Sequence, residues 1–278
     1  MTLFEALTAA RRKIDRLDAR LLLQQATGCS HGDLLARPET PVATAAGQRF
    51  MAWVERRASG EPLAYLVGEA EFRGRVFEVS PAVLIPRPET EVLIALALER
   101  LLGLAAPRVL DLGTGSGIVA ITLALECPAA AVVAVDLAAG AISVACANAR
   151  RLRAPVDFRE GDWFAPVAGE AFDLIVANPP YVAAGDPHLT RDGLPFEPQL
   201  ALTAGADGLA CIRRIVAGAS NHLKPGGWLL FEHAHDQGAA SRNLLTATGF
   251  QSPATFPDLA GSDRVSMAFF QSGAIMSD

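Results

Sequence analysis

A glycine-rich segment offers the first chemistry in the sequence. The run Asp111-Leu112-Gly113-Thr114-Gly115-Ser116-Gly117 follows an apolar stretch and precedes a helical pattern. Glycines permit a tight turn and a close approach of the backbone to a ligand, and a helix N-terminus offers free N–H groups. The third glycine comes one position too early for a dinucleotide fingerprint, and no lysine follows as in a phosphate-binding loop. The segment therefore predicts a ligand-binding loop of another kind, with a plain strand-to-helix turn as the alternative.

Two acidic positions further along the chain fit a nucleoside. Asp136 ends the next apolar strand, where a carboxylate can accept hydrogen bonds from both hydroxyls of a ribose. The alternative role of Asp136 is a helix N-cap. In Gly161-Asp162-Trp163-Phe164, the carboxylate can accept from the exocyclic amine of a purine and the aromatic ring can cover its face, unless this is a polar turn followed by core aromatics. Together with the glycine loop, these positions predict a nucleoside-bearing ligand without a pyrophosphate.

A stiff turn, Asn178-Pro179-Pro180-Tyr181, follows the apolar strand expected over 172–177. Each proline fixes its own φ and restricts the residue before it. The side-chain oxygen of Asn178 and the carbonyl of Pro179 could then both accept hydrogen bonds from one planar –NH2 group, while Tyr181 packs on its flat face. We therefore interpret the turn as a binding site for an amino or amide group, with an ordinary proline loop as the alternative.

Two further segments are weaker candidates for a functional role. The run Glu232-His233-Ala234-His235-Asp236 could supply metal ligands, but the expected strand ends at its first residue and no further ligand is evident, so we expect no metal. Arg87, between two prolines, could orient a carboxylate near the site or could be a surface cation, and the sequence leaves both open.

The elements that must position these loops form two regions. Apolar residues at three- and four-residue spacings predict helices over most of residues 1–66, one of them from Thr44, a candidate N-cap, to Arg57. The segment 71–79 alternates around a glycine and predicts a hairpin. We place the domain boundary near residues 80–85, giving an N-terminal helical domain with a hairpin linker over 1–80 and a second domain over 81–278.

From Glu89 onward, short apolar strands alternate with helical patterns, which predicts an α/β fold. The expected strands are 109–111, 131–136, 156–158, 172–177, 228–232 and 264–270, with helices over 117–125 and 139–152 between the earlier ones. Such a pattern gives a mostly parallel sheet with helices on both faces. Ligands of these sheets lie beyond the carboxyl ends of the strands, where all four loops fall.

The composition is that of a folded, soluble protein. Of 278 residues, 51% are hydrophobic and 19% charged, which excludes wholesale disorder. The formal net charge of −6 makes the chain a poor candidate for binding long nucleic acids through their phosphates. The four cysteines are far apart and predict reduced, mostly buried thiols. We see no targeting signal, and the most apolar helical run, 92–104, is too short to span a membrane.

These motifs resemble a known family. Asp-x-Gly-x-Gly-x-Gly with an acidic end to the second strand is the signature of class I S-adenosylmethionine-dependent methyltransferases, and Asn-Pro-Pro-Tyr marks their amino-group methylators. Nearly the whole chain is similar to the HemK/PrmC family, the protein-(glutamine-N5) methyltransferases of peptide chain release factors. Further segments that carry the resemblance are Gly60-Glu61-Pro62-Leu63-Ala64-Tyr65, Glu71-Phe72, Leu84-Ile85-Pro86-Arg87-Pro88-Glu89-Thr90-Glu91, Phe196-Glu197-Pro198 and Gly205-Ala206-Asp207-Gly208-Leu209.

The resemblance implies a fold, a cofactor and a substrate. The fold would be a Rossmann-like, mostly parallel seven-stranded sheet, and the cofactor S-adenosyl-L-methionine, with S-adenosyl-L-homocysteine as product. The cofactor-binding residues would be Asp111, Gly113, Thr114, Gly115, Ser116, Gly117, Asp136, Asp162, Trp163 and Asn178. The residues that hold the substrate glutamine amide would be Asn178, Pro179, Pro180 and Tyr181.

The resemblance also implies a partner. The helical domain would recognise a class I release factor, and the glutamine of its Gly-Gly-Gln motif would be methylated. We expect a cytoplasmic monomer with no direct nucleic-acid partner. Two alternatives remain: an adenine-N6 methyltransferase of DNA or RNA, which would share Asn-Pro-Pro-Tyr and extrude its base, and a non-catalytic cofactor-binding module. The net charge disfavours the first, and the two-acceptor turn disfavours the second.

Overall fold

The computed structural model describes residues 1–271 and divides into two compact units. The smaller unit comprises Met1–Glu69 together with the excursion Thr190–Phe196, and the larger unit comprises the rest of the described chain. The sequence analysis assigned the hairpin to the smaller domain, whereas the contacts place it from Ala70 onward with the larger unit.

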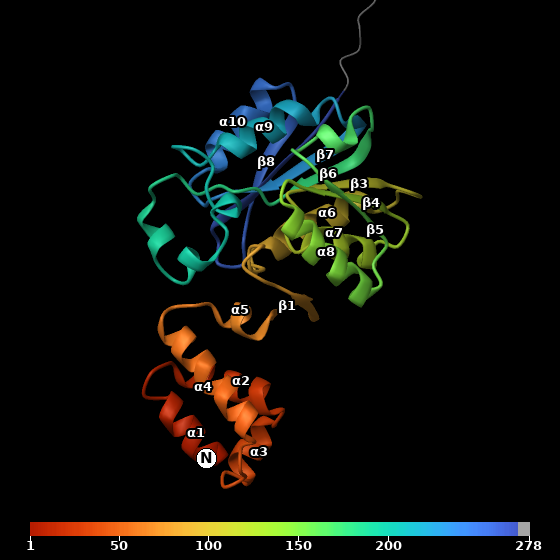
Figure 1. Ribbon diagram of the computed structural model, residues 1–278. Helices are drawn as coiled ribbons and strands as arrows, with labels where there is room; N and C mark the ends of the chain where they lie inside the picture. Colours follow the sequence, from red (N-terminus) through yellow and green to blue (C-terminus); the bar gives the residue numbers. More distant parts are fainter. Residues whose placement is uncertain (272–278) are drawn as a thin grey trace, which may run out of the picture. The chain divides into compact units, whose positions relative to one another are not determined.

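The smaller unit is built from short helices (Figure 1), two of which begin at a capping box. Thr2 and Ser30 each form a capping box with the acidic residue three positions later. Thr44 is the first helical residue rather than the cap, because Ala43 precedes the helix without a side-chain bond. Leu22 and Phe50 are fully buried in the helical core. The helices are α1 (Leu3–Ala10), α2 (Arg16–Thr27), α3 (His31–Ala36), α4 (Thr44–Ala58) and α5 (Leu63–Val67).

The hairpin consists of β1 (Glu69–Phe72) and β2 (Arg75–Glu78). The two residues between the strands both have positive φ, as a tight hairpin turn requires. The buried side chain of Asn148 accepts from the backbone N–H of Glu78 at 2.6 Å and donates to its carbonyl at 2.9 Å. Its amide nitrogen also donates to the carbonyl of Ser116, in the glycine loop. One buried amide therefore attaches the hairpin to the larger unit beside the expected ligand loop.

The larger unit contains a seven-stranded sheet in the order β5-β4-β3-β6-β7-β9-β8, as the fold class predicted. Neighbouring strands are parallel except at β9, which is antiparallel to β7 and β8. The strands are β3 (Arg108–Leu112), β4 (Ala131–Asp136), β5 (Val156–Glu160), β6 (Phe172–Ala177), β7 (Leu223–Glu232), β8 (Gln251–Pro257) and β9 (Asp263–Phe269). The sequence analysis missed β8, which contains Pro253; this strand lies at the sheet edge, where proline is tolerated.

Helices cover both faces of the sheet (Figure 1). On one face lie α6 (Thr90–Leu101), α7 (Ile118–Glu126) and α8 (Ala139–Leu152), and on the other α9 (Ala210–Ala219) and α10 (Gly238–Ala247). Alternate residues of each strand enter the two cores: Val109 packs with the first group, and Leu110 and Leu112 with the second. Because both faces are buried, the central strands are almost entirely apolar, as in other parallel sheets.

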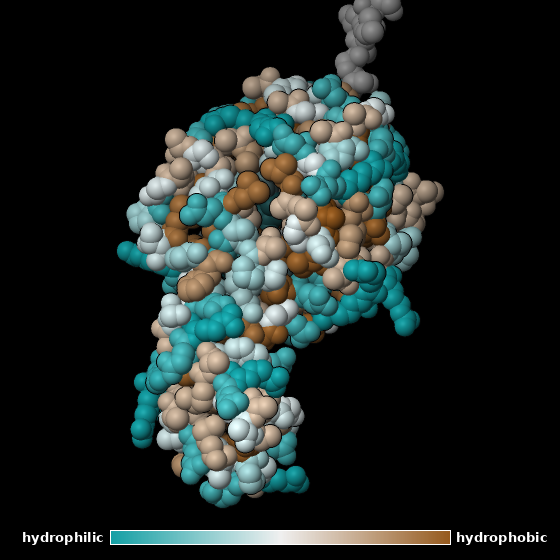
Figure 2. Space-filling view, viewed as in Figure 1, coloured by the Kyte–Doolittle hydropathy of each residue, from teal (hydrophilic) through white to brown (hydrophobic). Residues whose placement is uncertain are grey.

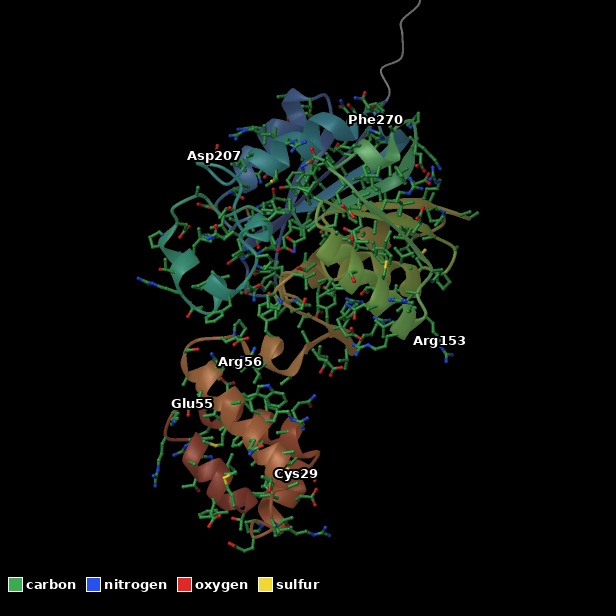
Figure 3. The ribbon with its side chains drawn as sticks, in the orientation of Figure 1. Cys29, Glu55, Arg56, Arg153, Asp207 and Phe270 are labelled. Atoms are coloured by element: carbon green, nitrogen blue, oxygen red, sulfur yellow. The ribbon has the colours of Figure 1, made fainter. Side chains whose placement is uncertain are left out.

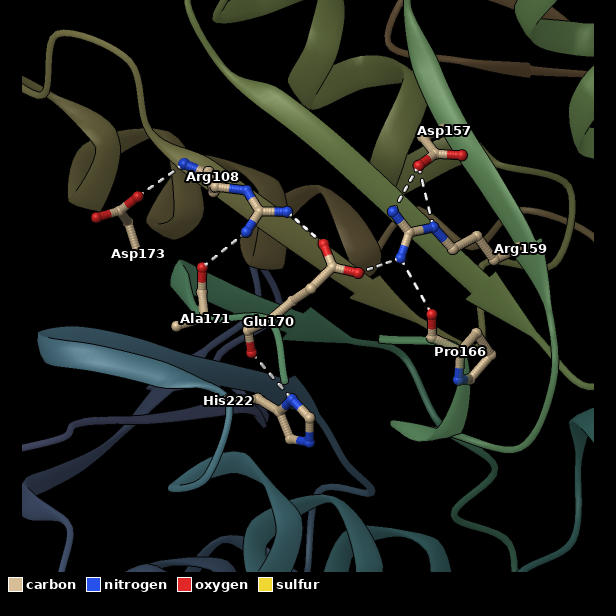
Figure 4. Close-up of polar contacts among 8 residues, drawn as sticks. All are labelled: Arg108, Asp157, Arg159, Pro166, Glu170, Ala171, Asp173 and His222. Atoms are coloured by element: carbon tan, nitrogen blue, oxygen red, sulfur yellow. Dashed lines mark hydrogen bonds and ion pairs between the residues drawn. The ribbon is translucent and has the colours of Figure 1, made fainter. Parts of the chain in front are cut away.

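A polar network links β3 and β5 to the segment that leads into β6 (Figure 4). Glu170 accepts from Arg108 at 2.6 Å through one oxygen and from Arg159 through the other. The backbone N–H of Arg108 donates to Asp173 at 2.7 Å, and its guanidinium lies over the ring of Phe172. A single carboxylate thus joins two guanidinium groups from strands that are not adjacent.

Replacing Glu170 with Gln removes the charge that both arginines share. We expect the free energy of unfolding at pH 7 to fall by about 1 kcal/mol, because the group is partly exposed. The hydrogen bonds from Arg159 and then Arg108 hold the pKa of Glu170 below its usual range. Its contribution is therefore present at neutral pH and is lost as the pH falls through that lowered pKa.

Urea unfolding of parent and variant at pH 7 and at about pH 3 measures this difference, which we expect to shrink at the lower pH. Glu99→Gln is the matched control, since Glu99 is exposed and pairs only with its neighbour Arg100 at 3.5 Å among the described residues. Equal losses in the two variants would contradict a role for the network.

Candidate active site

The register of the sheet brings three sequence-distant loops to one level. Leu112, the last residue of β3, pairs with Val135 of β4 on one side and with Ala177 of β6 on the other. The three strands therefore end at the same level, where the glycine loop, Asp136 and Asn178 lie. This point lies where the strand order reverses, the usual ligand position in open α/β sheets.

The glycine loop is shaped by its backbone. Gly113, Gly115 and Gly117 all have positive φ, so the turn itself accounts for all three glycines. The N–H groups of Gly113 and Thr114 both donate to the carbonyl of Val135, which attaches the loop to β4. A plain strand-to-helix turn therefore explains the loop geometry, and only the residues around the loop can indicate a ligand.

The surroundings form a pocket of about 230 Å³ in the larger unit. The space-filling view shows apolar residues around a hollow in this unit (Figure 2). The expected site residues in its lining are Asp111, Gly113, Thr114, Gly115, Ser116, Asp136, Asp162, Trp163, Asn178 and Pro180. Gly117, Pro179 and Tyr181 do not line it. Apolar lining that the sequence analysis did not single out includes Val83, Ile118, Val135 and Leu137.

Asp111 is a buried carboxylate in the pocket lining, only 1% exposed. Burial, the largest cause, raises the pKa of Asp111 to about 7; the hydrogen bond from Thr114 opposes the shift, and the charge of Asp136 adds to it. Within residues 1–271, neither Asp111 nor Asp136 forms an ion pair with a basic side chain. Two carboxylates of the lining therefore have no ion-pair partner, because the arginines of the lining, Arg87 and Arg214, pair with Glu197 and Asp162.

Asp136 combines features of both of its alternative roles. One carboxylate oxygen accepts from the N–H of Gly115 at 2.8 Å, and the other from the N–H of Ala138 at 2.9 Å, just ahead of α8. It therefore orders the glycine loop and the start of a helix. Each oxygen can accept a further bond, and the half-buried side chain lines the pocket, so it can still accept from a ligand hydroxyl.

Asp162 and Trp163 form another part of the lining. Trp163 has a φ of 48°, an uncommon value for a bulky residue, and its ring lies beside Gly113. Asp162 pairs with Arg214, also in the lining, at 2.6 Å, and both side chains are exposed. The aromatic ring thus lies directly beside the glycine loop and borders the pocket, while the carboxylate already has a cationic partner.

The Asn178 turn is held from behind by residues that the sequence analysis gave no role in the site. The side-chain nitrogen of Asn178 donates to Thr90 at 3.0 Å, and the hydroxyl of Thr90 donates to Glu232 at 2.8 Å. Tyr181 donates its hydroxyl to the other oxygen of Glu232 at 3.0 Å, and burial raises the tyrosine pKa far above its usual value. Gln237 donates to the backbone carbonyl of Tyr181. Nothing in the sequence indicates that Thr90, Glu232 and Gln237 contact this turn, because they come from distant segments.

Arg87 pairs with a carboxylate near the pocket, which decides between its two alternatives. Its guanidinium binds Glu197, which is 4% exposed and also accepts from the N–H of Ile85 at 3.0 Å. Ile85 and Arg87 line the pocket, as does Pro198, directly after the buried acid. Glu197 therefore joins two segments of the pocket wall that are more than 100 residues apart.

The remaining chemistry-bearing groups lie elsewhere. His233 is buried, and its ring bonds to Ser266 and to the carbonyl of Ala234. Across residues 1–271, no group of three or more His, Cys, Asp or Glu side chains is arranged to hold a metal ion. The four cysteines are free and half-buried, less buried than expected; Cys29 is visible in the smaller unit (Figure 3). No helix in the described residues is long and apolar enough to cross a membrane.

Solved structures that align with this chain include several methyltransferases. A methyltransferase from Pyrococcus furiosus aligns with a TM-score of 0.55 at 19% identity, over 80% of this chain and 98% of its own. The catalytic domain of hMettl16 bound to an RNA hairpin aligns at 0.57 and 16% identity, over 84% of each chain. The 16S rRNA N2 G1207 methyltransferase of T. thermophilus, in complex with AdoMet and guanosine, aligns at 0.56 and 23% identity, over 73% of this chain and 50% of that one. At these identities the likeness shows the fold.

Sequence comparisons are more specific. Residues 3–68 match the PrmC N-terminal domain, and residues 90–191 the methyltransferase small domain. The release factor glutamine methyltransferase of Xylella fastidiosa strain 9a5c is 49% identical over 262 residues, covering 94% of this chain and 95% of that protein. The Vibrio cholerae protein of the same name is 41% identical over 280 residues, covering 98% of each. The chain therefore belongs to the family of release factor glutamine methyltransferases, and its larger unit contains a methyltransferase domain.

Proposed function

We propose that this enzyme transfers a methyl group from S-adenosyl-L-methionine to the side-chain amide nitrogen of the glutamine in the Gly-Gly-Gln motif of class I release factors. The observation that carries the proposal is the position of Asn178. It lines the pocket beside the glycine loop, while its own amide nitrogen is engaged by Thr90. Its oxygen is thereby left as an acceptor for a substrate –NH2 group.

The residues of the pocket fit this cofactor. S-adenosylmethionine supplies an electrophilic methyl group on a positively charged sulfur, together with a ribose and an adenine. Asp111 and Asp136 are carboxylates of the lining that have no ion-pair partner in the described chain, which favours a cationic ligand. Asp136 can accept from ribose hydroxyls, and Trp163 with the apolar lining can cover the adenine. Asp162 is proposed to contact the adenine amine through the oxygen that Arg214 leaves free.

The chain's own contribution to catalysis is orientation. A glutamine amide nitrogen is a weak nucleophile because its lone pair is delocalised into the carbonyl. The Asn178 oxygen and the Pro179 carbonyl are proposed to accept from its two hydrogens, and Pro179 and Pro180 stiffen the turn that carries these acceptors. Tyr181 supports the same turn through its bond to Glu232. Fixed acceptors of this kind lower the barrier by holding the reacting atom in line with the methyl group.

We further propose that the smaller unit recognises the release factor. Its surface exposes large apolar side chains on three helices, Phe4, Leu17, Leu21 and Leu35. Apolar side chains that a protein leaves in water are common anchors for partners. The chain is taken to act as a cytoplasmic monomer on this protein substrate, with no direct nucleic-acid partner, since its net charge is −6.

The direct test measures radiolabelled methyl transfer to release factor, to DNA, to RNA, and to a release factor with the motif glutamine changed to alanine. We expect label only in the unchanged release factor. In Asn178→Ala, one of the two acceptors is lost, so the single-turnover rate should fall by about 10²–10³. A binding titration on the same variant should show little change in cofactor affinity. Transfer to RNA or DNA instead would show that the proposed substrate is wrong.

Cofactor affinity should depend on pH through Asp111. A cationic ligand favours the ionised carboxylate, whose pKa lies at about 7 without it, so binding should release a proton. Affinity is then expected to rise between about pH 5.5 and 7, by at most about tenfold per pH unit, and to level off above. Calorimetry in two buffers of different ionisation enthalpy counts the proton. In Asp111→Asn the rise in affinity with pH should vanish. A parent affinity that falls as the pH rises over the same range would rule out this linkage.

The docking role of the smaller unit predicts a change in KM. Phe4→Ala combined with Leu35→Ala, at positions 58% and 72% exposed, should raise the KM for intact release factor about 3- to 10-fold with kcat unchanged. Leu102→Ala is the control, because Leu102 is 79% exposed but belongs to the larger unit. If the double variant keeps the parent KM, as the control Leu102→Ala should, Phe4 and Leu35 are not partner anchors.

A further inference from the structure

Four side chains form one continuous hydrogen-bonded relay behind the Asn178 turn. The relay runs from the Nδ2 of Asn178 to the Oγ1 of Thr90, and from there to the Oε2 of Glu232. The hydroxyl of Tyr181 closes it on the Oε1 of the same carboxylate. Thr90 and Glu232 have no exposed surface, so water cannot replace these bonds. They come from the start of α6 and the end of β7 and do not line the pocket.

The relay has a direction because its members differ in what they can donate. Both oxygens of Glu232 accept from hydroxyls, Oε2 from Thr90 and Oε1 from Tyr181, so Thr90 gives its single hydroxyl proton to Glu232. The oxygen of Thr90 can then only accept from Asn178, which turns the amide nitrogen toward it. The amide oxygen is left for the pocket that Asn178 lines. The buried charge therefore determines which end of the asparagine amide the substrate meets.

We propose that Thr90 and Glu232 are positioning residues that make Asn178 present an acceptor, and that they thereby restrict the enzyme to substrates with an N–H donor. This inference rests on the proposed function, because it concerns how that site selects an amide –NH2 group. Reversing the relay would present a donor to the substrate –NH2, and two donors facing each other cannot bond.

A purely structural role explains the relay less well. Burying a carboxylate is costly, and an apolar side chain would satisfy a buried strand end at least as well. One oxygen of Glu232 instead accepts from Thr90, which holds Asn178, and the other accepts from Tyr181, so the carboxylate supports both ends of one turn. Burial raises the pKa of Glu232, its two hydroxyl donors and the charge of Arg264 lower it, and the charge of Glu89 raises it further. Both oxygens of Glu232 can accept from the two hydroxyls at once only when the carboxylate is ionised.

The sharpest test is Glu232→Gln, which keeps the shape and adds a donor. The new side-chain amide can donate to Thr90, whose proton then goes to the oxygen of Asn178, and the relay runs backwards. We expect the single-turnover rate on release factor to fall about 10²- to 10³-fold, with cofactor affinity changed less than about threefold. A variant that transfers methyl at the parent rate would overturn the proposal.

Substitutions at Thr90 separate the hydroxyl from the fold. Thr90→Val removes the relay and should slow transfer to a similar degree, whereas Thr90→Ser keeps the hydroxyl and should retain most of the rate. Thr122→Val is the matched control, because Thr122 is equally buried, lies outside the pocket lining and has no hydrogen-bond partner for its hydroxyl among the described residues. Equal effects of the two valine changes would show that only packing is involved.

The pH profile gives a readout that packing would not move. At saturating cofactor, the parent rate should fall as the pH drops through the raised pKa of Glu232, since the protonated acid no longer forces the direction of the relay. Glu232→Gln should lack this acid limb and be slow throughout. An unchanged acid limb in that variant would assign the titration to another group and count against the proposal.

A substrate-independent measurement keeps the inference separate from the proposed function. The side-chain –NH2 signal of Asn178, identified by its absence in Asn178→Ala, should exchange slowly with solvent in the parent and rapidly in Thr90→Val. If the parent leaves release factor unmethylated, the proposed substrate is wrong, and this signal still decides the relay. If the signal is the same in both proteins, the relay does not hold the amide and the inference fails.

Discussion

The register of β3 against its two neighbours is the constraint on which the site depends. With Leu112 level with both Val135 and Ala177, three chains leave the sheet at one height and their loops enclose one pocket. A slip of one residue would shift a loop by about 3.3 Å and turn every side chain of the strand to the opposite core. The cores prevent this, because Val109 belongs to one face and Leu110 to the other, and each is fully buried. Packing of ordinary apolar residues thus sets the geometry of the loops that line the pocket.

The parts of the site that could be predicted are those in which local chemistry coincides with a strand end. Asp136 and Asn178 each follow an apolar run, and the rule for open sheets converts that position into proximity. The contact between Thr90 and Glu232 could not be found in this way, because 142 residues separate them and neither the run 84–91 nor the run 232–236 indicates it. Glu232 even precedes two histidines, which suggested a metal cluster rather than a support for a distant turn. Strand β8 was hidden for a similar reason, since Pro253 is acceptable only at an edge that the sequence does not reveal.

The glycine loop shows why residue types alone are weak evidence for a ligand. Three alternating glycines suggested more than a turn requires, but all three have positive φ, so the backbone conformation is sufficient to explain them. Gly117 is further restricted by Ala145 of α8, where an added Cβ would come within 3.2 Å. Stronger evidence for a ligand lies beside the loop, in a buried carboxylate and an aromatic ring that share a pocket. Asp136 likewise holds the loop and the start of a helix, and these structural roles leave acceptors for a ligand.

Two buried carboxylates near the site, both with a pKa raised by burial, differ in the groups that surround them. Removing a carboxylate from water costs several kcal/mol unless other groups compensate. Glu232 receives two hydroxyl hydrogen bonds from the elements it supports, so it is satisfied before any ligand arrives and can hold the turn rigidly. Asp111 accepts from the hydroxyl of Thr114 and from the backbone of Ala120 and faces the charge of Asp136, and its pKa lies at about 7. A cationic ligand would stabilise its ionised form, so binding would be coupled to the ionisation of Asp111, which lines the pocket, and not to that of Glu232, which does not. The turn at Asn178 is thus held before any ligand binds, while carboxylates without an ion-pair partner lie where the charged cofactor is proposed to bind.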